Sequence, residues 1–305
     1  MRPSDNQRLT HVGMGGWDLP PFNGSFYPQR VCKGFRKLEY YSRFFDFVEV
    51  NATFYNSLLN VASARRWLED VADNKKFLFT IKLFRGFTHT YDATKEDVRA
   101  VHGLFEPLAE AGRLGGVVVQ FPYSFINHRE ARTYLIRLSR VMQPHRLFVD
   151  VRHASWNTQL MHNFFQENKL HLINVDLPPV RQHIPFNALA WDGHAYFRMM
   201  GRNTITWNHP ERGDRHDYLY NDEEMEHLLQ WLEYVQRSVG TTFVVFHNDP
   251  KAQSLYNGFR LRHLLEHNKR FQIPENLRLK FPALKAISTS ERPVLPLFAG
   301  VAENA

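Results

Sequence analysis

The chain has 305 residues, of which 43% are hydrophobic, and a formal net charge of +7. Cys32 is the only cysteine, which excludes a disulfide within the chain and a thiolate metal cluster. The first residues lack the apolar segment of a secretory signal, and no run approaches the ~20 apolar residues of a membrane span, so we expect a cytoplasmic protein with no membrane partner.

Strand-like and helix-like segments alternate along the chain. Apolar, β-branched or aromatic segments predict strands at residues 11–16, 47–51, 77–83, 116–121, 147–151, 171–175, 195–200 and 242–246. Helical periodicity predicts helices at residues 38–44, 62–71, 95–111, 129–142, 159–168, 222–238 and 252–266. This alternation is typical of a parallel sheet closed on itself, so we predict an α/β fold consisting of a single (β/α)8 TIM-like barrel.

The predicted barrel spans residues 11–286, after a flexible N-terminus at residues 1–10. Residues 287–305 have little periodicity, and we expect a short C-terminal appendage that is partly disordered. Residues 204–220 are polar, aromatic and interrupted by Gly and Pro, which predicts a long loop. An open doubly wound sheet is the alternative fold, but Gly13, Gly15 and Gly16 lack the spacing of its phosphate-binding turn.

Polar residues recur near the ends of seven predicted strands. Residues two apart on a strand share one face, and these residues have mostly apolar neighbours, so we expect them to point into the barrel. The residues are Glu49, Asn51, Thr80, Lys82, Gln120, Asp150, Arg152, Asn174, Asp176, Tyr196, Arg198 and Asn248. Because buried charges are costly unless paired, these three acids and three bases predict an ion-pair network. It forms either a site at the mouth, where barrel enzymes carry their catalytic groups, or a structural filling of the barrel.

Several short motifs resemble one known family. They include GMGGW at residues 13–17, VEVNATFY at 48–55, FLFTIK at 77–82 and RHASW at 152–156. Over residues 12–265 the chain resembles the YecE-like domain-of-unknown-function family 72. The resemblance implies a TIM-like barrel with a pocket, but no reaction. The chain departs from the family pattern at Asp150, where Glu is usual, and at His247, where the first of two Asn often stands.

We assign candidate roles as follows. The candidate catalytic residues are Glu49, Asp150, Lys82 and His89, since carboxylates, amines and imidazoles transfer protons. The candidate substrate-binding residues are Trp17, Asn51, Tyr55, Gln120, Arg152, His153, Trp156, Asp176, Arg198 and Asn248. No metal-ligand spacing is present, so we expect no cofactor; a hard-metal site built from Glu49, Asp150 and Asp176 is the competing hypothesis.

The positive charge and the candidate arginines favour an anionic ligand. The leading hypothesis is an enzyme of hydrolase or lyase type that acts on a small or oligomeric anionic substrate, plausibly one bearing phosphate. Nucleic-acid binding or processing is an alternative, for which Arg85, Arg181, Arg202, Arg212 and Arg215 would have to converge on the mouth. Glycoside hydrolysis and non-catalytic ligand binding also remain open, as does the oligomeric state.

Overall fold

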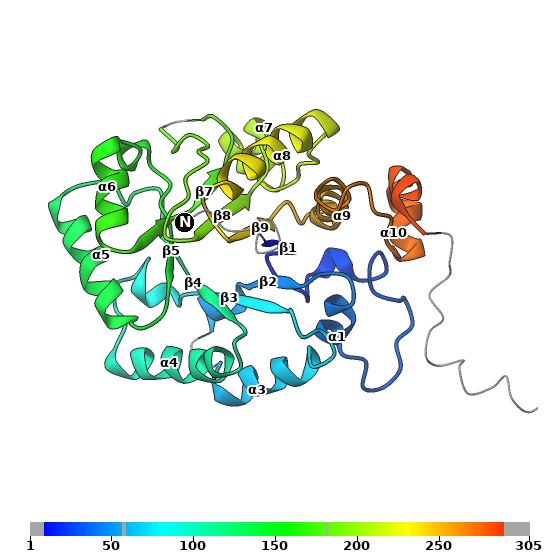
Figure 1. Ribbon diagram of the computed structural model, residues 1–305, viewed down its shortest axis with the longest axis horizontal. Coiled ribbons are helices and arrows are strands. Elements are labelled where there is room, and N and C mark those ends of the chain that lie inside the picture. The colour runs from blue at the N-terminus through cyan, green and yellow to red at the C-terminus, as the bar shows by residue number, and fades with distance from the viewer. Residues whose placement is uncertain (1–8, 57–58, 181, 290–305) are drawn as a thin grey trace, which may run out of the picture.

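The computed structural model describes residues 9–56, 59–180 and 182–289. In this part of the chain, nine parallel strands form one sheet with helices outside it, which confirms the predicted α/β barrel (Figure 1). The strands are β1 (Leu9–Met14), β2 (Phe47–Val50), β3 (Leu78–Lys82), β4 (Leu114–Gln120), β5 (Leu147–Asp150), β6 (Leu170–Leu172), β7 (Asn174–Asp176), β8 (His194–Met199) and β9 (Thr241–Phe246).

The sixth predicted strand is split into β6 and β7. Its first half pairs with β5 and its second half with β8, and Ile173 lies between the two. The order of the sheet is β6-β5-β4-β3-β2-β1-β9-β8-β7. Because β6 and β7 are consecutive in the chain, the sheet closes almost completely on itself, as the eight-strand prediction requires.

Helices surround the sheet in Figure 1 in roughly the order of the chain. They are α1 (Lys37–Ser42), α2 (Ala52–Tyr55), α3 (Val61–Asp70), α4 (Lys95–Glu110), α5 (Arg129–Val141), α6 (Gln159–Glu167), α7 (Thr204–Asn208), α8 (Asp222–Gln236), α9 (Gln253–Leu265) and α10 (Glu275–Lys280). Side-chain caps fix several starts: at α8, the Asn221 side chain accepts a hydrogen bond from the Glu224 amide at 2.9 Å.

Two apolar clusters lie on opposite faces of the sheet. Phe47, Val118, Phe148, Tyr196 and Phe243 fill the barrel interior. Their strand neighbours belong to a larger cluster between the sheet and the helices. This alternation gives each strand one face toward the interior, and continuing that face past the strand's carboxyl end brings side chains to the barrel mouth.

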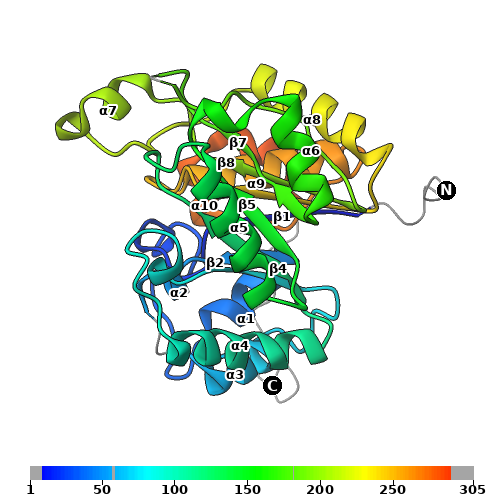
Figure 2. The same ribbon diagram turned by 90° about the vertical axis from the view of Figure 1, so that its left-hand side faces the viewer.

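Residues 204–220 are more structured than predicted. They contain α7 and a 3-10 turn at Pro210–Arg212. Figure 2 shows α7 and the short helix α2 at the same end of the sheet. The order also extends further at both ends of the barrel, because β1 begins at Leu9 and a 3-10 helix spans Pro282–Ile287. Most of the predicted C-terminal tail, residues 290–305, lies outside the described residues, as do residues 1–8 of the predicted N-terminus.

No helix in the described ranges is long and apolar enough to cross a membrane.

Candidate functional site

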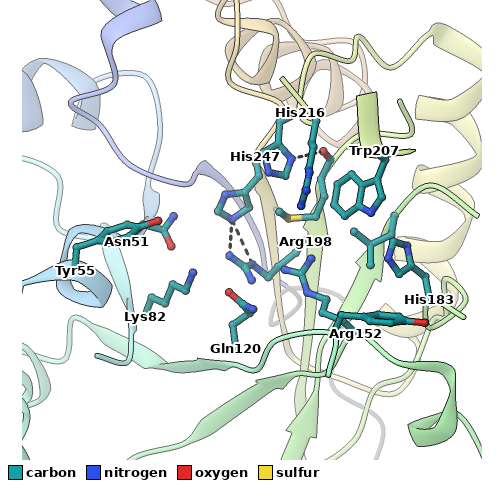
Figure 3. Close-up of a pocket in the computed structure, with 14 residues that line it drawn as sticks. Asn51, Tyr55, Lys82, Gln120, Arg152, His183, Arg198, Trp207, His216 and His247 are labelled. Atoms are coloured by element: carbon teal, nitrogen blue, oxygen red, sulfur yellow. Dashed lines mark hydrogen bonds between the residues drawn. The ribbon is translucent and has the colours of Figure 1, made fainter. Parts of the chain in front are cut away.

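A pocket of about 410 Å³ opens where the carboxyl ends of the strands converge (Figure 3). Most of its lining residues end a strand or follow one directly, and the rest come from the loops at the mouth. They are Asn51, Tyr55, Lys82, Gln120, Tyr123, Arg152, Leu177, His183, Arg198, Met200, Trp207, Arg215, His216 and His247. The structure therefore brings together six of the predicted site residues: Asn51, Tyr55, Lys82, Gln120, Arg152 and Arg198.

Arg198 lies at the centre of a buried ion network beneath this pocket. Its Nη2 donates to Glu49 Oε1 at 2.8 Å, and its Nη1 donates to Asp150 Oδ2. Arg152 forks onto the same aspartate, with Nε 2.6 Å from Oδ1 and Nη2 2.8 Å from Oδ2. Glu49 and Asp150 are fully buried, so each depends on these guanidinium groups for its stability as an anion.

The ion pairs outweigh the effect of burial on both acids. Burial by itself would raise the pKa of Glu49, but Arg198 and His247 together hold that pKa well below its usual range. The pKa of Asp150 is also lowered, because Arg152 and Arg198 offset its burial. Both carboxylates are therefore ionised at neutral pH and have no role as proton donors there.

A short hydrogen-bond chain supports Glu49 from inside the barrel. The Tyr196 hydroxyl donates to Glu49 Oε2 at 2.8 Å and lies 2.8 Å from Thr80 Oγ1. Because a tyrosine has one hydroxyl proton, Thr80 is the donor in the second bond. These two hydrogen bonds fix the orientation of the Glu49 carboxylate.

His247 completes the network from β9. Its Nε2 lies 3.0 Å from Glu49 Oε1 and 3.1 Å from Arg198 Nη2. Burial and the charge of Arg198 lower the pKa of His247 to about 4, so the ring is neutral at pH 7. Gly15 makes room for it, since a Cβ at that position would lie 2.4 Å from the ring.

Lys82 differs from the other cations of the pocket. Its Nζ lies 4.0 Å from the centre of the Phe54 ring, and no carboxylate among the described residues forms an ion pair with it. Burial and the positive charge of Arg198 lower the pKa of Lys82 to about 7. A large fraction of Lys82 is therefore a neutral amine at neutral pH, which is the form that acts as a base or nucleophile.

Among the residues that the structure describes, the lining carries positive charge and no acidic side chain. Its charged members are Lys82, Arg152, Arg198 and Arg215. Arg215 stacks over the Trp207 ring at 5.5 Å, where the loop between β8 and α8 covers one side of the pocket. A concave surface lined by one sign of charge attracts ligands of the opposite sign.

Three polar residues predicted to point into the barrel point away from it: Asn174, Asp176 and Asn248. The Asn174 side chain donates to Leu189 O at 2.9 Å, while its strand neighbours Ile173 and Val175 belong to the interior cluster. Asp176 accepts hydrogen bonds from Arg202 Nε at 2.9 Å and from the Tyr220 hydroxyl at 2.6 Å, between the sheet and α8. Asn248 donates to Tyr218 O at 2.8 Å and also contacts Asn257. The predicted strand phase was wrong at the sixth and eighth strands, where Leu177 and His247 take the inward positions.

The prediction that Trp17 and Trp156 bind substrate in the pocket is wrong as well, since neither lines it. Trp17 packs edge-to-face against Trp67, with 5.6 Å between the ring centres. Trp156 is completely buried, stacks on Phe125 and donates its Nε1–H to the Phe125 carbonyl at 2.8 Å. Both rings belong to the packing of the helix layer, which is the ordinary role of an aromatic side chain next to a barrel.

The two predicted histidines lie outside the pocket lining. His89 lies edge-on to Phe54, 4.8 Å between the ring centres, and its Nδ1 is 2.9 Å from Thr88 Oγ1. His153 is held by Ser155 and Gln182, each 2.9 Å from one of its ring nitrogens. Both rings are hydrogen-bonded to side chains of loop residues, and the Ser155 backbone N–H also donates to His153 Nδ1 at 3.1 Å.

The three carboxylates considered for a hard metal do not converge. Glu49 and Asp150 are bound by arginines, and Asp176 lies in the helix layer. In the described ranges, no group of three or more His, Cys, Asp or Glu side chains is arranged to hold a metal ion.

The sequence interpretation missed several lining residues. They are Tyr123, Leu177, His183, Met200, Trp207, His216 and His247. Counting in steps of two from the inward residues Val175, Arg198 and Val245 would have found Leu177, Met200 and His247. The lining residues that come from loops follow no strand alternation, so the sequence pattern does not identify them.

Of the loop arginines named for nucleic acid, Arg215 lines the pocket, whereas Arg85, Arg202 and Arg212 do not, and Arg181 lies outside the described residues.

The fold and the site define an α/β barrel with a cationic pocket at the carboxyl ends of its strands. The chain belongs to the family described as "Protein of unknown function DUF72", which matches residues 11–279 and confirms the resemblance seen in the sequence.

Relatives share both sequence and fold. The UPF0759 protein YunF of Bacillus subtilis is 25% identical over 276 residues, which cover 85% of this chain and 95% of YunF. A DUF72 family protein from Thermotoga maritima has a similar structure, with a TM-score of 0.74 and 29% identity over 85% of this chain and 100% of its own. One from Enterococcus faecalis shares the fold, with a TM-score of 0.75 and 22% identity over 85% of this chain and 96% of its own.

Proposed function

We propose that this protein is an enzyme that binds a small anionic substrate in the barrel pocket and moves a proton with Lys82. One observation carries the proposal: the described residues of the pocket lining include four cationic side chains and no acidic one, above two carboxylates that are already paired. A volume of about 410 Å³ fits a small ligand or one end of a longer one.

The roles follow from the contacts of each side chain. Glu49 and Asp150 hold the guanidinium groups of Arg152 and Arg198 from below, and the N–H groups that these carboxylates leave free can donate to a phosphate or carboxylate. The proton therefore moves through Lys82 rather than through Glu49 or Asp150, because the pKa of Lys82 is lowered to about 7, whereas the pKa values of both carboxylates are lowered below their usual range.

Two alternatives have less support. Nucleic-acid binding requires the loop arginines to converge, and Arg215 is the one among the described loop arginines that lines the pocket. Glycoside hydrolysis requires two carboxyl groups that reach the substrate, whereas Glu49 and Asp150 are fully buried and bound to arginines.

The anion-binding part is tested by calorimetric titration of the whole chain with inorganic phosphate and pyrophosphate at pH 7. Arg215→Gln removes an exposed lining charge, and Arg212→Gln is its matched control on the same loop. We expect Arg215→Gln to weaken binding by about three- to tenfold, corresponding to a rim charge worth ~1 kcal/mol, and Arg212→Gln to change it by less than about twofold. Equal affinities in both variants, or no binding by the unaltered chain, would contradict the proposal.

The catalytic part is tested by turnover. A panel of phosphorylated and carboxylated metabolites is incubated with the unaltered chain and with Lys82→Met, and product formation is followed by mass spectrometry. We expect turnover of at least one compound to fall by about a hundredfold or more in Lys82→Met, as is usual for loss of a group that transfers a proton. A turnover that Lys82→Met preserves would sink the assignment of Lys82.

A further inference from the structure

The surroundings of Lys82 suit an amine nucleophile as well as a proton-transfer group. Among the described residues that line the pocket it is the only primary amine, and it lies at the end of β3 with its Nζ against the Phe54 ring. Figure 3 shows the side chain extending into the cavity toward Arg198. The described part of the lining contains no serine, threonine or cysteine, and Cys32 is exposed elsewhere.

Among the described residues, the nearby acids form ion pairs with other groups and none with this amine. The carboxylate oxygens of Glu49 and Asp150 accept hydrogen bonds from Arg198, Arg152 and Tyr196. Burial and the neighbouring guanidinium charges disfavour the ammonium form, and together they outweigh Glu49 and Asp150, whose charges favour it. A lysine next to other cationic groups and partly removed from water is a recognised arrangement for an amine nucleophile.

We propose that Lys82 forms an imine with the carbonyl carbon of an aldehyde or ketone that carries a carboxylate or phosphate group. This inference rests on the proposed function, because it assigns the anionic group to Arg152, Arg198 and Arg215 and names the second functional group of the same substrate.

The bond changes balance as follows. The Nζ lone pair forms a bond to the carbonyl carbon while the π electrons of the carbonyl move to its oxygen. One proton passes from nitrogen to that oxygen, which gives a carbinolamine. The oxygen then takes up one proton from solvent and leaves as water, and the nitrogen lone pair forms the protonated C=N bond. The guanidinium groups nearby can stabilise the negative oxygen of the first step. No redox partner is needed.

Reductive trapping tests the inference. The whole chain is incubated at pH 7 with pyruvate as the carboxylate probe or dihydroxyacetone phosphate as the phosphate probe, together with sodium cyanoborohydride, which converts an imine into a stable secondary amine. Peptide mass spectrometry then locates the adduct. We expect one dominant adduct on Lys82 with at least one probe, and slower labelling when inorganic phosphate is added. The probe that reacts distinguishes a carboxylate from a phosphate substrate.

Two variants control the site of reaction. Lys82→Arg keeps the positive charge and removes the nucleophile, whereas Lys76→Arg makes the same change at an exposed lysine. We expect the adduct to disappear in Lys82→Arg and to persist in Lys76→Arg. Should Lys82→Arg fail to fold, trace acetylation of the unaltered chain replaces it: Lys82 should react about tenfold or more faster than Lys76 at pH 7, as its neutral fraction requires.

The outcomes separate this inference from the proposed function. No adduct on Lys82 with either probe, or equal labelling of Lys82 and Lys76, overturns the imine. Phosphate binding that depends on Arg215 would in that case leave the anion-binding function standing. A Lys82 adduct that neither phosphate nor Arg215→Gln affects supports the imine and contradicts the anion-binding role of the arginines.

Discussion

Two ion networks, each with buried carboxylates, are built around Arg198 and Arg202, which lie close together in the chain, and they have different structural roles. The pocket network consists of Glu49, Asp150, Arg152 and Arg198 beneath the barrel mouth. The layer network consists of Asp176, Arg202, Tyr220 and Glu224 between the sheet and α8. In each, a carboxylate at a strand end pairs with an arginine from β8 or from the residues just after it.

The two networks differ in whether charged side chains next to them remain without a partner of opposite charge. In the layer network, Arg202 Nη1 also donates to Glu224 at 3.0 Å, and the tyrosine donates to Asp176, so its main groups are satisfied within the protein. In the pocket network, Glu49 and Asp150 are paired with arginines. Lys82 and Arg215 line the pocket next to this network, and the described part of the lining has no acidic side chain to pair with them. A charged cluster is thus a candidate site when its charges exceed those it neutralises, and burial alone does not make it one.

The largest expected effect separates the two arginines. Arg198→Met leaves two fully buried carboxylates without their shared partner, and we expect the free energy of unfolding to fall by about 3–5 kcal/mol. Arg202→Met costs about 1–2 kcal/mol, because Arg202 is 38% exposed and Tyr220 still donates to Asp176. Urea denaturation of both variants measures the difference. Equal losses would show that the two networks are energetically alike.

An intermediate effect tests the glycine that accommodates His247 beside the pocket network. Gly15→Ala places a Cβ 2.4 Å from the His247 ring, and the overpacking should destabilise the protein by about 1–3 kcal/mol. Gly103→Ala is the control: it lies within α4, its Cβ would lie 3.6 Å from Val61, and alanine should stabilise the helix by about 0.5–1 kcal/mol. The melting temperatures of both variants, measured by thermal unfolding, test this difference in stability. A neutral Gly15→Ala would mean that His247 moves freely.

The smallest expected effect is in the pH dependence of stability. The folded-state pKa of Glu49 is lowered, so its contribution is complete above its unfolded pKa near ~4.3 and is lost as the pH falls through the folded value. The folded-state pKa of Asp176 is raised by burial, which Arg202 offsets only in part, so its contribution is present at low pH and is lost as the pH rises through the folded value. The two networks therefore respond to acid with opposite signs.

Substitutions test these signs through slopes. Unfolding free energies are measured between about pH 3 and pH 7, where one pKa unit corresponds to ~1.4 kcal/mol. Glu49→Gln should make stability fall less steeply toward acid, and Asp176→Asn should make it rise more steeply with increasing pH. Parallel curves for the two variants and the unaltered chain would refute the opposite signs.

Much of the fold could be predicted because it depends on local patterns. Strand and helix segments alternate at the spacing of a barrel, and the caps at Asn60, Thr94 and Asn221 start helices through bonds to residues three positions ahead. The inward positions of Glu49, Lys82, Asp150 and Arg198 also followed from strand alternation. That reasoning failed at Asn174, Asp176 and Asn248, where polar character was used to choose the face.

What the sequence by itself determined is the barrel, its family and the residues that follow regular strand alternation to the mouth. Those features depend on local periodicity and on short motifs. The tertiary structure decided which acids pair with which arginines, that Trp207 and Arg215 fold over the pocket, and that Lys82 has no carboxylate partner among the described residues. These features arise from groups brought together from distant parts of the chain, as with Glu49 and Arg198, and such proximity leaves no periodic signal in the sequence.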